Sequence, residues 1–187
     1  RWTYAGPGGA PAQIPGRRMI DDFRFRTIGA ATSLYGVVSA HARHSLSPFL
    51  HNAAFTAAGI DAAYVPLQAA NFGDFLDFAV ALGIRGASVT IPFKLEALRA
   101  AATADDVARA VGAANTLRLA DGRWEATNTD VAGFLEPLEA LLVGTPLRGL
   151  RAAVLGAGGS ARAVVVALVT CGARVTVHAR RPEQARE

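Results

Sequence analysis

The sequence AAVLGAGGSA, residues 152–161, decides the fold of the C-terminal part of the chain. Its first four residues predict an apolar strand, which runs into a glycine-rich turn and then into a helix over 159–171. A second strand, expected at 174–178, completes the strand–turn–helix–strand order that is typical of a dinucleotide-binding β-α-β unit. Gly156 permits the tight turn, and Gly158 lets backbone N–H groups at the helix N-terminus approach a pyrophosphate.

The whole turn is therefore a candidate cofactor site. Ala161 occupies the third glycine position of the G-x-G-x-x-G pattern, and the pattern accepts alanine there. The residues expected to contact the cofactor are Gly156, Ala157, Gly158, Gly159, Ser160 and Ala161. The alternative is a plain strand–helix turn whose glycines serve packing alone.

The end of the second strand indicates which dinucleotide the turn would bind. An NAD site places a carboxylate there for the ribose hydroxyls, but this chain has Arg180 and Arg181, with no carboxylate before Glu183. Two guanidinium groups suit a 2′-phosphate, so the sequence favours NADP. The alternative is a pair of solvated surface arginines.

Residues 148–187 account for only the first of the two mononucleotide halves that a complete dinucleotide domain contains, so we expect the chain to be a fragment. Upstream, short apolar strands alternate with helices, one of which should begin with Ser47 as N-cap and Pro48 in its first turn. Other strands are expected at 34–38 and 86–91. The pattern predicts an α/β fold: a leading segment (1–33), an N-terminal α/β substrate-binding domain (34–147) and a truncated Rossmann NADP-binding domain (148–187).

Composition excludes several other classes of protein. The 187 residues are 51% hydrophobic and 18% charged, with a formal net charge of +4, which argues against intrinsic disorder. Basic residues are scattered rather than gathered into a stripe, so we expect no nucleic-acid partner, and no apolar run is long enough to cross a membrane. The single cysteine, Cys171, fits a reducing compartment and a cytoplasmic location. The histidines His41, His44, His51 and His178 lack metal-ligand spacing, so no metal site is expected.

One residue stands out against this composition. Lys94 is the only lysine in a chain with 18 arginines. An ammonium group can lose its proton near neutral pH when its surroundings allow it, whereas a guanidinium cannot. The sequence therefore makes Lys94 a candidate acid–base residue, against the alternative of a surface lysine at a helix start.

Four polar clusters lie between residues 44 and 130, each at the end of an expected helix or strand, where sites on α/β folds are usually built. They are His44-Ser45-Leu46-Ser47-Pro48, Ser88-Val89-Thr90-Ile91-Pro92-Phe93-Lys94, Gly112-Ala113-Ala114-Asn115-Thr116 and Asn128-Thr129-Asp130. Together with the glycine-rich turn, and in this order, they resemble shikimate dehydrogenase over about residues 34–187. The resemblance implies reduction of the ketone of 3-dehydroshikimate by NADPH, giving shikimate.

The resemblance also implies roles for individual residues. Lys94 and Asp130 would form the catalytic acid–base pair. Substrate would be bound by Ser45 and Ser47 through its carboxylate, and by Ser88, Thr90 and Asn115. Two positions depart from the family pattern: Ser88 stands where many members have Asn, and Val131 where many have Gly.

The leading segment requires a separate explanation, because free-standing shikimate dehydrogenases begin near Leu34. Residues 1–33 resemble the last strand, lip loop and last helix of type I 3-dehydroquinate dehydratase, an enzyme known in fusions with shikimate dehydrogenase. Gln13 would match its substrate-contacting loop glutamine, while Ala12 replaces the usual glycine of that loop. The alternative is an unrelated leader.

Three other functions remain open at this point. A quinate or quinate/shikimate dehydrogenase would use the same residues. A ligand-binding or regulatory module could keep the fold without catalysis, although Lys94 and Asp130 argue against it. A methylenetetrahydrofolate dehydrogenase shares the two-domain plan, but Ser45 and Ser47 as a carboxylate site disfavour it.

Overall fold

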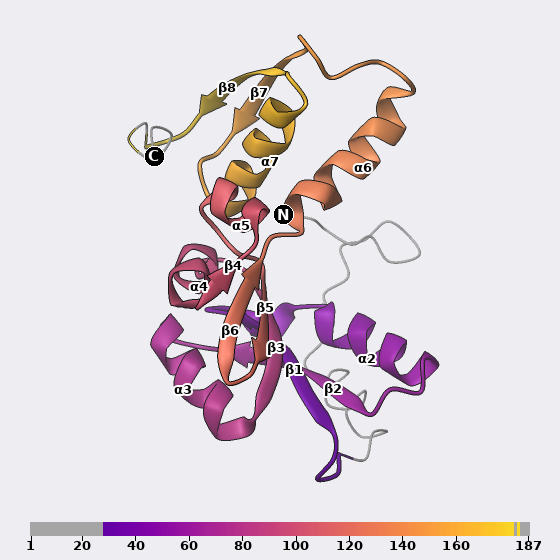
Figure 1. Cartoon of the computed structure of the whole chain (residues 1–187), viewed down its shortest axis with the longest axis vertical. Coiled ribbons are helices and arrows are strands. Elements are labelled where there is room, and N and C mark those ends of the chain that lie inside the picture. Colours follow the sequence, from indigo (N-terminus) through magenta and orange to yellow (C-terminus); the bar gives the residue numbers. More distant parts are fainter. Residues whose placement is uncertain (1–27, 182, 184–187) are drawn as a thin grey trace.

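A computed structural model describes residues 28–181 and 183, and within these residues the strands form two sheets (Figure 1). The strands are β1 (Ser33–Ser39), β2 (Ala62–Gln68), β3 (Ile84–Val89), β4 (Thr103–Ala104), β5 (Thr116–Ala120), β6 (Arg123–Thr127), β7 (Arg151–Leu155) and β8 (Arg174–His178). The helices are η1 (Ala42–His44), α2 (Ser47–Ala57), α3 (Phe72–Leu82), α4 (Lys94–Ala100), α5 (Asp106–Val111), α6 (Asp130–Leu142) and α7 (Gly159–Thr170). The alternation confirms the predicted α/β fold.

The larger sheet has the strand order β2-β1-β3-β5-β6-β4. Strand β1 lies between β2 and β3 and runs parallel to both, whereas β5 runs antiparallel to β3 and to β6. The β5–β6 hairpin turns at Asp121 and Gly122, whose φ angles of 50° and 73° suit the tight turn that the Asp-Gly pair predicted. Since the strand ends of β1 and β3 meet the open end of this hairpin, polar residues from distant parts of the chain gather there.

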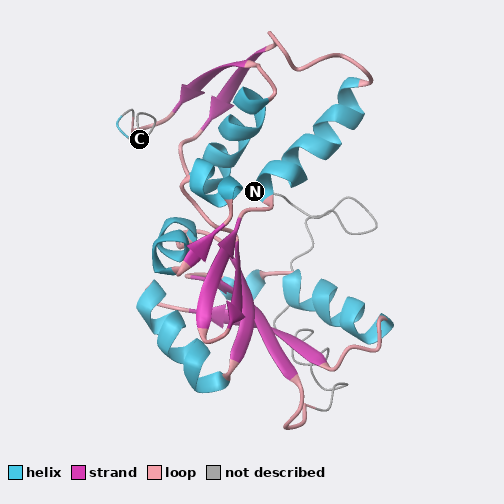
Figure 2. Ribbon diagram, in the orientation of Figure 1, coloured by secondary structure: helices cyan, strands magenta, loops and turns pink. Residues whose placement is uncertain are grey.

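Helices cover both faces of the larger sheet. Figure 2 shows α2 on one side of the sheet and α3 and α4 on the other. On the α3 and α4 side, a buried apolar core joins the helices to the strands; its larger members are Val38, Leu67, Phe72, Phe75, Ile84, Val89, Phe93 and Leu117. This packing fixes the strands whose ends carry the polar clusters.

Helix termini follow the sequence signals in one helix and depart from them in another. Asn71 caps α3 by accepting a hydrogen bond from the backbone N–H of Asp74 (3.0 Å), and Gly83 ends the helix with φ at 64°; asparagine before a helix and glycine after it are the residue types that predict such ends. The prediction that Ser47 caps α2 was wrong. Leu46 occupies the N-cap and Ser47 is the first helical residue, with no side-chain cap.

The expected strand 86–91 is also displaced in the structure. Strand β3 begins at Ile84 and ends at Val89, because the carbonyl of Thr90 accepts a hydrogen bond from the backbone N–H of Phe93 (3.0 Å) and so closes a turn. Helix α4 then begins at Lys94, with Phe93 as its N-cap residue. The lysine therefore stands at the first position of a helix, directly after the polar turn.

The C-terminal unit has the expected β-α-β order. Strands β7 and β8 pair in parallel, from Arg151 opposite Arg174 to Leu155 opposite His178. Helix α7 connects them and packs against α6 through an apolar cluster that includes Phe134, Leu138, Leu147, Val154 and Leu168. Helix α6 thus packs with the β-α-β unit although it precedes residue 148, and the domain boundary stays a prediction.

Part of the predicted organisation falls outside the described residues. Residues 1–27, which include Ala12 and Gln13, carry most of the dehydratase-like segment. Within residues 28–181 and 183, none of the helices combines the length and apolar character needed to cross a bilayer.

Candidate active site

A polar cavity of about 320 Å³ lies at the strand ends of the larger sheet. It is lined by Val37, Ser45, Ser47, Ser88, Val89, Thr90, Lys94, Asn115, Thr116, Thr129 and Asp130. The structure therefore brings together all seven residues that the sequence predicted for catalysis and substrate binding. Sequence reasoning assigned no role to Val37, Val89, Thr116 and Thr129, although the last three adjoin residues that it did choose.

Lys94 and Asp130 form an ion pair inside this cavity. Lys94 Nζ lies 2.5 Å from Asp130 Oδ2, and the two side chains are 12% and 27% exposed. Each residue is the first of its helix, α4 and α6 respectively. A cation is unfavourable at a helix N-terminus and an anion is favourable, so Asp130 provides the compensating charge that Lys94 needs there.

Asn115 holds the carboxylate of this pair from the other side. Its amide nitrogen donates to Asp130 Oδ1 (2.8 Å) and to Thr129 Oγ1 (2.9 Å). Its amide oxygen accepts from Thr116 Oγ1 (3.0 Å) and from the backbone N–H of Thr129 (3.0 Å). Both donors and both lone pairs are thus engaged within the cluster. This arrangement orients Asp130, and the substrate contact that the resemblance implied for Asn115 stays a prediction.

Two buried polar residues brace the loops around the pair, and no sequence signal pointed to either role. Asn128 is 5% exposed; its side chain donates to the Ala113 carbonyl (2.8 Å) and accepts from the backbone N–H of Asp130 (2.9 Å). Ser39 is 3% exposed and donates to the carbonyl of Ile91 (2.9 Å), in the turn that leads to Lys94.

Hydroxyl groups line the other side of the cavity. Ser47 lies in the first turn of α2, and its backbone N–H donates to Ser45 Oγ (3.2 Å). The N-terminus of this 11-residue helix carries a positive partial charge, so the two serines face a location where an anion is favoured. Ser88 and Thr90 line the cavity from the end of β3 and the turn after it.

The glycine-rich turn lies against the same lysine. Gly156 has φ at 123°, a conformation that L side chains rarely adopt, and Gly158 is the N-cap of α7 with no side-chain cap. A Cβ at Gly159 would lie 3.1 Å from Cδ of Lys94 and 3.2 Å from its Cβ. Ser160 Oγ, predicted to contact the cofactor, accepts a hydrogen bond from Lys94 Nζ (3.3 Å).

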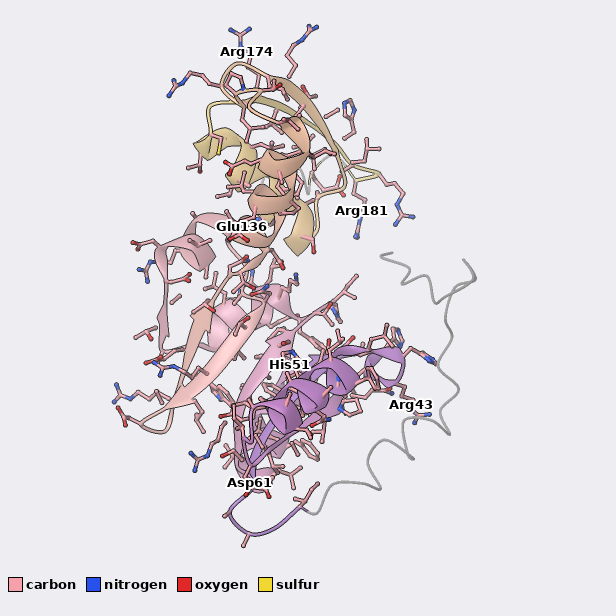
Figure 3. All side chains as sticks on the ribbon, turned by 90° about the vertical axis from the view of Figure 1, so that its right-hand side faces the viewer. Arg43, His51, Asp61, Glu136, Arg174 and Arg181 are labelled. Atoms are coloured by element: carbon pink, nitrogen blue, oxygen red, sulfur yellow. The ribbon has the colours of Figure 1, made fainter. Side chains whose placement is uncertain are left out.

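An apolar contact holds the turn in this place. Ala163 of α7 is fully buried against Val111 of α5 and Ala113. At the far end of the nucleotide-binding unit, Arg180 and Arg181 follow β8 and are exposed; neither forms an ion pair with another described residue. Figure 3 shows Arg181 and Arg174 at opposite ends of β8. Both arginines after β8 are therefore available to an anion.

Residues 28–181 and 183 contain no group of three His, Cys, Asp or Glu side chains that could hold a metal ion. The polar side chains that line the cavity carry hydroxyl groups, one amide, one ammonium and one carboxylate. Such a set can bind a polar, anionic molecule and move a proton to or from one of its oxygens.

An α/β unit with a polar cavity at its strand ends, joined to a β-α-β unit with a glycine-rich turn, is the architecture of two-domain α/β dehydrogenases. Residues 37–117 match a family model described as the shikimate dehydrogenase substrate binding domain.

Curated relatives extend the match beyond this segment. The chain is 47% identical over 162 residues to shikimate dehydrogenase (NADP(+)) from Anaeromyxobacter dehalogenans (strain 2CP-1 / ATCC BAA-258), covering 86% of this chain and 57% of that protein. It is 44% identical over 149 residues to the protein of the same name from Caulobacter vibrioides (strain NA1000 / CB15N), covering 78% and 52% respectively. The chain thus spans little more than half the length of these relatives.

Solved structures give the same result. The crystal structure of shikimate dehydrogenase from Aquifex aeolicus superposes with a TM-score of 0.78 at 36% identity, covering 86% of this chain and 60% of that one. The enzyme from Thermus thermophilus, in complex with NADP(H) and shikimate, gives a TM-score of 0.72 at 35% identity, covering 83% and 59%. These similarities confirm the resemblance to shikimate dehydrogenase; the dehydratase-like leading segment stays a prediction.

Proposed function

We propose that this chain forms the substrate-binding domain and the first nucleotide-binding half of a shikimate dehydrogenase, which interconverts 3-dehydroshikimate and shikimate with NADP. The observation that carries the proposal is the Lys94–Asp130 ion pair, set in a polar cavity and in contact with the glycine-rich turn. The relatives named above, which are NADP-dependent shikimate dehydrogenases, support it.

The turn has the features that a dinucleotide needs. A Cβ at Gly158 would meet open space, so backbone N–H groups at the start of α7 are accessible to a pyrophosphate. Residues 156–161 would hold that group, and Arg180 and Arg181 would hold a 2′-phosphate. When bound, NADPH supplies the hydride that the substrate's carbonyl carbon accepts.

The chain's own contribution to the reaction is the proton. An ammonium group has three N–H donors, and those of Lys94 include one for Asp130 and one for Ser160. The third can donate to the substrate's carbonyl oxygen and transfer its proton there as negative charge develops. In the oxidation direction the neutral amine accepts the proton of the hydroxyl group. Asp130 keeps the lysine in place, and Asn115 keeps Asp130 in place.

Substrate orientation would come from the hydroxyl groups of the cavity. We assign Ser45 and Ser47 to the substrate carboxylate, because they lie beside the N-terminus of α2. Ser88 and Thr90 would contact ring hydroxyls.

The test is shikimate-dependent reduction of NADP by the full-length protein, compared with the Lys94→Ala variant. We expect a loss of kcat of about 100- to 10,000-fold, the usual range for removing a general acid–base residue. Arg99→Ala, an exposed change on the same helix, is the matched control and should keep wild-type turnover. Full turnover by Lys94→Ala would remove the catalytic assignment, and no turnover by the wild type would remove the substrate assignment.

The resemblance of residues 1–33 leads us to propose a second, separate activity for the parent protein, dehydration of 3-dehydroquinate by an upstream domain. Supplying 3-dehydroquinate with NADPH to the full-length protein should yield shikimate without an added dehydratase. Turnover of 3-dehydroshikimate but not of 3-dehydroquinate would limit the protein to the dehydrogenase. Turnover of quinate, measured beside that of shikimate, tests the alternative of a quinate or quinate/shikimate dehydrogenase. The cytoplasmic location stays a prediction.

A further inference from the structure

Tyr64, a residue outside the polar clusters, reaches the cavity through Ser88. It lies on β2, is 4% exposed, and its hydroxyl donates a hydrogen bond to Ser88 Oγ at 2.7 Å. Ser88 lies on β3, and β1 runs between these two strands. The tyrosine side chain therefore extends across β1, and its hydroxyl group contacts Ser88, which lines the cavity.

Helix α2 fixes the tyrosine in this position. The side chain of Asn52 donates to the backbone carbonyl of Tyr64 (2.8 Å) and accepts from its backbone N–H (2.9 Å). The ring of His51, labelled in Figure 3, stacks on the ring of Tyr64 with centroids 4.1 Å apart and an interplanar angle of 14°. Since Ser47 opens the same helix, one element supports both Tyr64 and the expected carboxylate site.

The direction of the hydrogen bond determines what Ser88 can offer to a ligand. A serine hydroxyl has one hydrogen and two lone pairs, and Tyr64 occupies one lone pair. The hydrogen of Ser88 is then free to point at an acceptor in the cavity. Burial raises the pKa of Tyr64, so at neutral pH the phenol keeps the hydrogen that it donates to Ser88.

We propose that Tyr64 is a positioning residue that sets Ser88 as a hydrogen-bond donor toward an acceptor oxygen of the substrate. Ser88 stands where many shikimate dehydrogenases have Asn, whose amide brings its own fixed donors. In this chain the phenol supplies the orientation that a freely rotating serine hydroxyl lacks. The inference rests on the proposed function, because it takes shikimate as the ligand of this cavity.

The experiment is a double-mutant cycle on shikimate affinity, measured by calorimetry with the full-length protein and no nucleotide. Tyr64→Phe keeps the buried ring but removes the hydroxyl, and we expect the Kd for shikimate to rise about 5- to 10-fold. Ser88→Ala should raise the Kd to a similar extent. The double variant should bind no more weakly than Ser88→Ala alone, because Tyr64 acts only through Ser88.

Two controls separate positioning from a merely structural role. Tyr35→Phe alters the neighbouring tyrosine of β1, whose ring packs on Phe55, and should leave the Kd unchanged. Ser88→Thr keeps a hydroxyl group, so Tyr64→Phe should still raise the Kd for shikimate when it is introduced into the Ser88→Thr variant. If Tyr64→Phe folds poorly, comparing Ser88→Thr with Ser88→Ala still tests the donor: equal loss of affinity in both would overturn the proposal.

The outcomes are distinguishable from failure of the proposed function. Additive effects of Tyr64→Phe and Ser88→Ala, or an unchanged Kd in Tyr64→Phe, would overturn this inference while the wild type still turns over shikimate. Absence of both shikimate binding and turnover in the wild type would overturn the proposed function, and this inference with it.

Discussion

At the scale of single residues, hydrogen bonds between side chains fix the orientation of the charged pair in the cavity. Asp130 receives a hydrogen bond on each carboxylate oxygen, from Lys94 and from Asn115. Together, the two hydrogen bonds fix the orientation of the carboxylate. Asn115 therefore affects the reaction through Asp130, and its replacement should have a different kinetic signature from the loss of a substrate contact.

Asn115→Ala should lower kcat by about 10- to 100-fold, the effect of losing a hydrogen bond to a charged group, while the KM for shikimate changes little. Steady-state kinetics of the full-length protein measure both constants. Thr90→Val provides the comparison, because we expect Thr90 to contact the substrate, and loss of such a contact should raise KM. A rise in KM alone for Asn115→Ala would favour the substrate contact that the resemblance implied.

The nucleotide preference also belongs to individual residues. Replacing Arg180 and Arg181 together with Ala should reduce the preference for NADP over NAD by about 10-fold or more, since the 2′-phosphate loses two charge-assisted contacts. The ratio of kcat/KM for the two nucleotides is the measurement. Arg174→Ala, at the opposite end of β8, is the matched control (Figure 3). An unchanged ratio in the double variant would contradict the NADP assignment.

At the scale of elements, the glycines of the turn serve different purposes. Gly158 has open space where a Cβ would stand, whereas Gly159 packs against the side chain of Lys94. The pattern G-x-G-x-x-G gives no hint of this difference, because the contact joins residues far apart in the sequence. Gly159, which we expect to contact the nucleotide, therefore also packs against Lys94.

Gly159→Ala should lower kcat by about 10-fold or more, because the added methyl group displaces a lysine that Asp130 and Ser160 hold in place. Gly158→Ala should instead raise the Kd for NADP and leave shikimate binding intact. Nucleotide and shikimate titrations of the two variants separate these effects. Equal losses of NADP affinity in both variants would show that Gly159 serves only the nucleotide.

Short sequence patterns predicted most helices, strands and turns, but they failed where contacts between distant residues determine the structure. Asn71, Gly83 and the Asp121-Gly122 turn were predictable, because caps and tight turns depend on a few consecutive residues. Ser47 was misplaced as an N-cap, since the same residue types suit the cap and the first turn. The Tyr64–Ser88 bond escaped detection, because it joins different strands and follows no short-range pattern.

At the scale of the whole molecule, the described chain leaves an apolar surface uncovered. A cavity of about 370 Å³ between α6, β7 and α7 is lined almost entirely by aliphatic side chains and Phe134. Leu155, at the end of β7, is 82% exposed. Strand β7 pairs only with β8 among the described strands, so one of its edges offers unpaired backbone groups.

The 187-residue chain, produced alone, should therefore self-associate as its concentration rises. Leu155→Lys should reduce the associated fraction, because it places a charge on the free edge strand. Size-exclusion chromatography with light scattering measures the fraction. Ala57→Lys adds the same charge to the exposed end of α2, away from this sheet, and is the control. A wild-type chain that stays monomeric at high concentration would contradict the prediction.

The contact between Lys94 and Gly159 limits how freely the two units can be exchanged between proteins. A designer who grafts another nucleotide-binding half onto residues 34–147 would choose it for its cofactor. The graft must also leave space for the side chain of Lys94. Any donor with a side chain at this position would press on the carbon chain of Lys94, however well it bound NADP. Compatibility between the halves of such a chimera therefore depends on the surface where they meet, and at position 159 that surface requires a glycine.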